Sequence, residues 1–209
     1  MALQPSLSPL LIGSPAAPHT LEVYLDYVCP FSAKIFNNAL DQLIKPAVTE
    51  PGGRYDIYGK VKVILRLHPQ PWHGSSTFLH EAALAVLRVA PQAFWAYSRV
   101  LFKHQEEFFD IPVSQLSPIQ IRAKLVELGK EAGLNDAQMA EVAELLKYKS
   151  SPNGGVAVTD DLKYNIKIGR HNSIHVSPTV LFDGLIAGDV SSSWGDNEWS
   201  SFFKSRVTA

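Results

Sequence analysis

Residues 27–32 read Tyr-Val-Cys-Pro-Phe-Ser and mark the point at which a strand pattern changes into a helical one. Upstream, residues 21–27 alternate apolar and polar side chains, which is typical of a strand. Downstream, apolar residues recur at helical spacing over residues 31–43. We therefore expect Cys29 just before the first turn of a helix, with Pro30 at the first helical position, where its missing N–H is not needed.

Cys29 is the only cysteine among the 209 residues, and two interpretations of it are open. The unpaired N–H groups and the positive dipole end of a helix start stabilise a thiolate, which predicts a reactive thiol. The alternative is a buried structural cysteine, because cysteine is among the most buried residue types. The order strand, Cys-Pro, helix favours the reactive interpretation.

The composition indicates a soluble globular protein, with 46% hydrophobic residues, 19% charged residues and a net charge of −1. It shows no basic patch for nucleic acid and no apolar run of the roughly 20 residues that cross a bilayer. Residues 1–18 contain no Lys or Arg and are interpreted as a loosely ordered leader rich in Pro and Ser. A single reduced cysteine is consistent with a cytoplasmic protein.

A second strand is predicted at residues 61–67, and a crossover through the first helix would make the two strands parallel. Ligands of open α/β sheets bind beyond the carboxyl ends of the strands, where Cys29 and the loop of residues 68–74 would project. Trp72 and His73 in this loop are candidate site residues. Trp72 could equally cover the edge of the core, since a large aromatic ring can do both.

Residues 75–171 have a helical pattern, interrupted at Pro91. Ser117 and Asn135 each stand three residues before a glutamine, which predicts two capped helix starts. The apolar stripes here are more often core than binding sites. His80, near the start of the first of these helices, is expected to be a surface or packed histidine rather than a site residue.

A short hairpin is predicted across Asp183-Gly184, and it follows directly on Ser177-Pro178-Thr179. A cis bond before Pro178 would expose the backbone of Ser177 as an edge for a peptide or for glutathione. A last helix is expected at residues 196–206.

This order of elements resembles the DsbA family of the thioredoxin superfamily over about residues 20–207. The resemblance implies an α/β, thioredoxin-like fold with a helical insertion. It places the thioredoxin-like domain at residues 19–74 and 172–209 and the insertion at residues 75–171.

The resemblance also implies a site at Cys29, Pro30, Phe31 and Ser32 together with the loop of residues 177–179, in which Pro178 packs beside the cysteine. Ser32 stands where the family's second cysteine would be. A lone thiol cannot form an intramolecular disulfide, so dithiol oxidase activity is excluded for the isolated chain. Glutathione transferases of the kappa class and 2-hydroxychromene-2-carboxylate isomerases carry a similar insertion and use a serine near the helix start to activate glutathione.

Three functions remain open. Cys29 could form mixed disulfides with glutathione or a client thiol. The chain could instead be a glutathione-dependent transferase or isomerase whose small organic substrate lies against Trp72 and His73, or a non-catalytic binding module. No cofactor is required, although glutathione can serve as a co-substrate, and no metal site is predicted because the histidines lack companion ligands at the right spacing. The sequence does not indicate the oligomeric state.

Overall fold

The computed structural model describes residues 3–208, which divide into two compact units. We call the first the sheet unit; it comprises the chain up to Leu25, Pro30–Arg66 and the chain from Val176 onward. The second, the helical unit, comprises Asp26–Cys29 and Leu67–His175. The helical insertion predicted at residues 75–171 forms most of the helical unit. This unit also contains Asp26–Cys29 and residues 67–74, which were predicted to belong to the thioredoxin-like domain, and it extends to His175.

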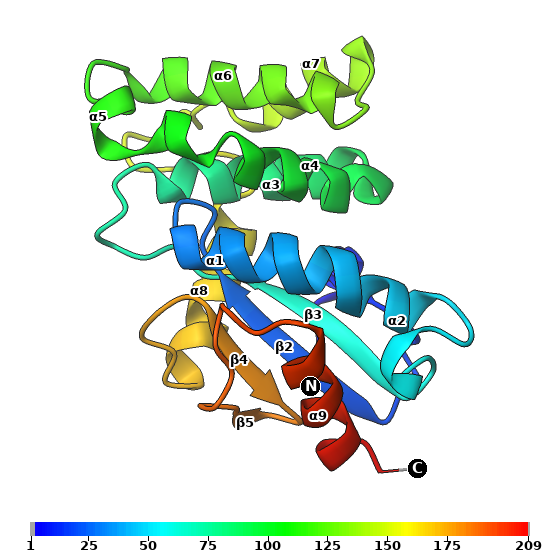
Figure 1. The fold of residues 1–209 in the computed structure, drawn as a ribbon. Coiled ribbons are helices and arrows are strands. Elements are labelled where there is room, and N and C mark those ends of the chain that lie inside the picture. Colours follow the sequence, from blue (N-terminus) through cyan, green and yellow to red (C-terminus); the bar gives the residue numbers. More distant parts are fainter. Residues whose placement is uncertain (1–2, 209) are drawn as a thin grey trace. The chain divides into compact units, whose positions relative to one another are not determined.

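Within the described residues, the sheet unit is built on five strands in the order β1-β3-β2-β4-β5. Figure 1 labels all of them except β1. They are β1 (Leu11–Ile12), β2 (His19–Leu25), β3 (Val61–Leu67), β4 (Thr179–Phe182) and β5 (Leu185–Ile186). β1 is antiparallel to β3, and β4 is antiparallel to β2 and to β5. Asp183 and Gly184 both have positive φ angles, of 49° and 85°, as the tight turn predicted between β4 and β5 requires.

The expectation of a loosely ordered leader is wrong for the described part of residues 1–18. Residues Pro5–Leu10 form a short 3-10 helix, η1, and β1 follows it and pairs with β3. Leu7 and Leu10 are 0% and 1% exposed. The segment is ordered because its few apolar side chains are buried in the sheet unit, which outweighs the Pro and Ser content around them.

The helix predicted after Cys29 begins at Pro30, as expected. It runs as one unbroken ribbon through α1 (Pro30–Ile35), the π-helical segment η2 (Phe36–Ile44) and α2 (Lys45–Thr49) (Figure 1). A short turn, η3 (Arg54–Asp56), leads to β3.

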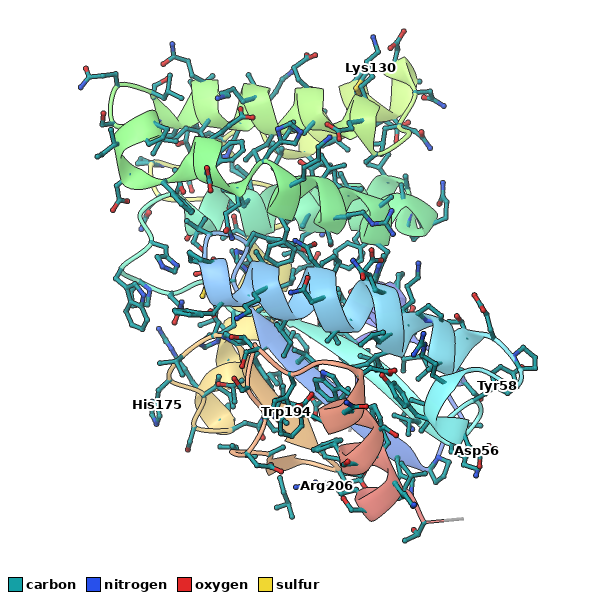
Figure 2. All side chains as sticks on the ribbon, in the orientation of Figure 1. Asp56, Tyr58, Lys130, His175, Trp194 and Arg206 are labelled. Carbon is teal, nitrogen blue, oxygen red and sulfur yellow. The ribbon has the colours of Figure 1, made fainter. Side chains whose placement is uncertain are left out.

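The last helix, α9 (Asp196–Arg206), has the predicted bounds. It buries Trp199, Phe202 and Phe203, and Trp194, labelled in Figure 2, packs edge-on against Trp199 with ring centroids 5.4 Å apart. This aromatic cluster anchors α9 in the sheet unit.

The helical unit consists of helices stacked in layers (Figure 1). α3 (Ser76–Val89) packs against α4 (Phe94–Lys103), α6 (Pro118–Glu131), α7 (Asp136–Leu145) and α8 (Thr159–His171). Side chains fill the space between these ribbons (Figure 2). The shorter turns are η4 (Pro91–Ala93), η5 (Gln105–Phe108) and α5 (Asp110–Val113).

The predicted starts of α6 and α7 are confirmed, since Ser117 and Asn135 each form a reciprocal capping box with the glutamine three residues on. Within residues 3–208, no helix combines the length and the apolar character that crossing a membrane requires.

Candidate active site

Cys29 ends a tight turn, Asp26–Cys29, that is held by hydrogen bonds within the helical unit. The Cys29 N–H donates to the carbonyl oxygen of Asp26 at 3.0 Å. The side-chain amide of Gln105 donates to the carbonyl oxygens of Tyr27 and Cys29 at 2.7 and 3.0 Å. Cys29 itself is only 3% exposed. The backbone on either side of the thiol is therefore fixed by both local and distant groups.

The carboxylate of Asp26 organises this turn and the loop that follows β3. Its Oδ1 accepts hydrogen bonds from the N–H of Val28 at 2.9 Å and from the hydroxyl of Ser76 at 2.6 Å. Its Oδ2 lies 2.9 Å from the N–H of Gln70 and 2.8 Å from Nδ1 of His73. Asp26 is 0% exposed. Four groups thus meet one buried carboxylate three residues before the thiol.

The surroundings of Asp26 keep it ionised. Burial on its own would raise the pKa of this carboxyl group. The electrostatic interaction with His80 and the hydrogen bonds from Ser76, Val28 and His73 outweigh burial, so that the pKa of Asp26 is lowered. An ionised carboxylate only accepts hydrogen bonds, so His73 donates through Nδ1 and its Nε2 faces away from the bond.

His73 is consequently an oriented imidazole. Its side chain is 20% exposed, whereas its carboxylate partner is fully buried. A carboxylate that fixes the ring and the tautomer of a histidine is an arrangement suited to proton transfer.

His80 and His68 belong to the same unit but are more enclosed. His80 is 0% exposed, packs on the ring of Tyr27 with centroids 4.9 Å apart, and has Nδ1 2.8 Å from the carbonyl oxygen of Ser76. It is a packed histidine, as the sequence analysis expects. Burial lowers the pKa of His68, and the electrostatic interaction with His80 lowers it further.

Comparison with known proteins identifies the family. The family model described as thioredoxin matches residues 6–194. The chain belongs to the thioredoxin family.

Several solved structures share the fold of this thioredoxin-family chain, and DsbA-type proteins are among them. A candidate protein-disulfide isomerase from Pseudomonas syringae is 28% identical with a TM-score of 0.70, and the match covers 95% of this chain and 99% of that one. BdbD from Bacillus subtilis is 19% identical with a TM-score of 0.65, over 99% and 97% of the two chains. DsbA from Chlamydia trachomatis is 15% identical with a TM-score of 0.65, over 93% and 89%. No curated protein sequence matches the chain.

The predicted site residues of the thioredoxin-family chain are distributed over both units. Cys29, Trp72 and His73 lie in the helical unit. Trp72 is 56% exposed and packs edge-on against His73, with centroids 6.2 Å apart. More than half of the Trp72 side chain is exposed, so Trp72 does not cover the edge of the core. It remains a candidate site residue.

The other predicted residues lie in the sheet unit: Pro30, Phe31, Ser32, Ser177, Pro178 and Thr179. Phe31 is 63% exposed and Ser32 is fully buried. The Ser177-Pro178 peptide bond is cis, as expected, and Thr179 opens β4 with its hydroxyl donating to the carbonyl oxygen of Val176. The position of Pro178 beside Cys29 stays a prediction.

Asp26, Gln70, Ser76 and Gln105 also belong to this thioredoxin-family site, although the sequence pattern did not predict them. The alternating pattern assigned Asp26 to the polar face of a strand, whereas it begins the turn that leads to Cys29. One local signal was available, since aspartate commonly accepts a hydrogen bond from the N–H two residues on. The other three residues come from distant segments and carry no such signal. No group of three or more metal-ligating side chains is found in the described chain.

Proposed function

We propose that the chain carries out DsbA-like thiol-disulfide exchange through the single nucleophile Cys29. The observation that carries this proposal is the position of Cys29, which ends a turn held by Asp26 and Gln105 immediately before α1. The thioredoxin family and the DsbA-type neighbours support the same chemistry.

The proposed step is an exchange of one disulfide for another. The Cys29 thiol gives up its proton, for which the Asp26 and His73 pair is the proposed acceptor. The thiolate then attacks one sulfur of glutathione disulfide or of a client disulfide. A bond forms between Cys29 and that sulfur, and the other sulfur leaves as a thiolate, which takes up a proton. Because this chain has no second cysteine, a thiol of glutathione or of the client must attack the mixed disulfide to release Cys29.

Glutathione is proposed as the co-substrate and the cytoplasm as the compartment. A reducing compartment maintains the abundant thiol that a monothiol cycle needs for its second step. The exposed Trp72 is proposed to contact the partner, because a large aromatic ring provides apolar area at the edge of the site.

The burial of Cys29 favours a second candidate function. In a glutathione-dependent transferase or isomerase, the reacting thiol belongs to bound glutathione, so the protein's own sulfur need not reach the solvent. The small organic substrate would then lie against Trp72 and His73.

Intact-mass analysis after incubation with oxidised glutathione tests the proposal. We expect one glutathione adduct on the native protein and none on Cys29→Ser. His73→Ala should form the adduct more slowly at neutral pH. A protein that forms the adduct only after unfolding in urea would contradict the proposal. Tight binding of reduced glutathione to Cys29→Ser would favour the second candidate.

A further inference from the structure

His104 connects three elements of the helical unit. It follows directly on the last residue of α4 and precedes η5. Its Nδ1 lies 2.7 Å from Oε1 of Glu107 in η5, and its Nε2 lies 2.7 Å from Oε2 of Glu131, the last residue of α6. One imidazole ring thus contacts two carboxylates that belong to two different elements.

Both contacts are hydrogen bonds only while His104 carries two N–H groups. The hydrogen bond from His104 lowers the pKa of Glu107, and hydrogen bonds from Lys103 and His104 lower that of Glu131, so both carboxylates are ionised. An ionised carboxylate only accepts hydrogen bonds, and a neutral imidazole has a single N–H to donate. The geometry therefore requires the imidazolium form, and loss of its proton would turn a nitrogen lone pair toward one carboxylate.

The groups around His104 favour its protonated form. The hydrogen bond to Glu107 raises the pKa of His104, and the hydrogen bond to Glu131 and the charges of both carboxylates raise it further against the opposing effect of burial. The ring also stands at the C-terminal end of α4, where the helix dipole favours a cation. Two lysines share the same carboxylates, since Lys124 lies 3.3 Å from Glu107 and Lys103 contacts Glu131.

The residue that follows His104 holds the turn of Cys29. Gln105 is 5% exposed, and its side-chain amide donates to the carbonyl oxygens of Tyr27 and Cys29. The two carboxylate contacts of His104 fix the backbone at the start of the same short segment. Cys29 is buried, so local opening is needed for a reagent to reach its sulfur. The stability of η5 therefore affects access to Cys29.

We propose that His104 is a proton-controlled clamp, which in its protonated form holds η5 and the Cys29 turn closed and which loosens them when it loses its proton. The opening that exposes Cys29 is then more frequent at alkaline pH. Exposed ion pairs contribute little individually, so we expect the frequency of opening to change about two- to fivefold. This regulation rests on the proposed function, in which Cys29 is the nucleophile.

Alkylation of Cys29 by iodoacetamide, followed by intact-mass analysis of the full chain, tests the clamp. The rates of His104→Gln and wild type are compared as a ratio at about pH 6 and about pH 9, so that the pH-dependent thiolate fraction cancels. We expect the variant to react about two- to fivefold faster at the lower pH and at the same rate as wild type at the higher one. A ratio of one or less at the lower pH, or equal ratios at both, would overturn the proposal.

His171→Gln is the matched control. It makes the same change at an exposed histidine of α8 and should react like wild type at both pH values. A rate raised at the lower pH as much as that of His104→Gln would show that the effect does not come from the clamp and would overturn the proposal.

Amide hydrogen exchange of the wild-type protein provides a test that needs no variant. After correction for the intrinsic effect of pH, protection of residues 105–108 should fall about two- to fivefold as the pH rises through the titration of His104, whereas protection of α7 should not change. Constant protection of residues 105–108 would contradict the clamp. Neither measurement requires disulfide exchange. A chain that shows both effects but forms no glutathione adduct would therefore refute the proposed function and not the clamp.

Discussion

Asp26→Asn tests whether the buried carboxylate holds the turn before Cys29 together. Asparagine has nearly the same shape, but it replaces one accepting oxygen with an NH2 group. Oδ1 of Asp26 accepts from the N–H of Val28 and Oδ2 from the N–H of Gln70. Whichever oxygen is replaced, one backbone N–H must face the NH2 group. A backbone donor cannot reverse its role, whereas the hydroxyl of Ser76 and the ring of His73 can.

The expected loss of stability follows from these contacts. One orphaned backbone N–H costs about 1–3 kcal/mol. The hydrogen bonds that remain lose their charge assistance, which is worth about 0.5–2 kcal/mol for each. Three hydrogen bonds remain, so we expect Asp26→Asn to lower the free energy of unfolding by at least about 3 kcal/mol at neutral pH.

The loss of stability caused by Asp26→Asn should depend on pH. The pKa of Asp26 is lowered in the folded state, so its stabilising contribution is fully present above the unfolded value of about 3.9. That contribution is lost as the pH falls through the folded-state pKa. The difference between wild type and Asp26→Asn should therefore narrow in acid.

Urea unfolding followed by tryptophan fluorescence, at about pH 7 and about pH 3, measures both effects. Asp110→Asn, at an exposed position, is the matched control and should leave the unfolding midpoint unchanged. A midpoint for Asp26→Asn equal to that of wild type, or a difference that stays the same in acid, would show that the ionised Asp26 does not stabilise the turn.

Three further changes probe other parts of the chain. Glu22→Ala leaves the fully buried Arg66 without its carboxylate partner, whose Oε2 lies 2.6 Å from Arg66 Nε. The free energy of unfolding in urea should fall by about 3–5 kcal/mol. Glu22→Leu combined with Arg66→Met should recover most of the loss. The hydrogen bond to Asp183 raises the pKa of His19 despite burial. NMR should therefore show a pKa of His19 above about 6.5 in the wild type and a lower pKa in Asp183→Asn. The same pKa in both proteins would contradict the contact. Gln105→Ala removes the donor to two backbone carbonyl oxygens and should cost about 1–3 kcal/mol in the same unfolding assay, with no change expected if the turn is held by Asp26 alone.

Several elements could be predicted from the sequence because their signals are local. The bounds of β3 and α9, the capped starts of α6 and α7, and the turn at Asp183-Gly184 all agree with the pattern of residues. Each depends on side chains and backbone groups within a few positions of one another. The position of Cys29 before a helix is a signal of the same kind.

The distant groups that complete the site are brought together by the tertiary fold. The polar face predicted for Asp26 became a buried anion because Gln70, His73 and Ser76 reach it from about 45 to 50 positions away. The leader is ordered because its apolar side chains are buried in the sheet unit. Burial and the pairing of hydrogen-bonding groups depend on which segments come into contact in the fold. A local sequence pattern carries no information about contacts between distant segments.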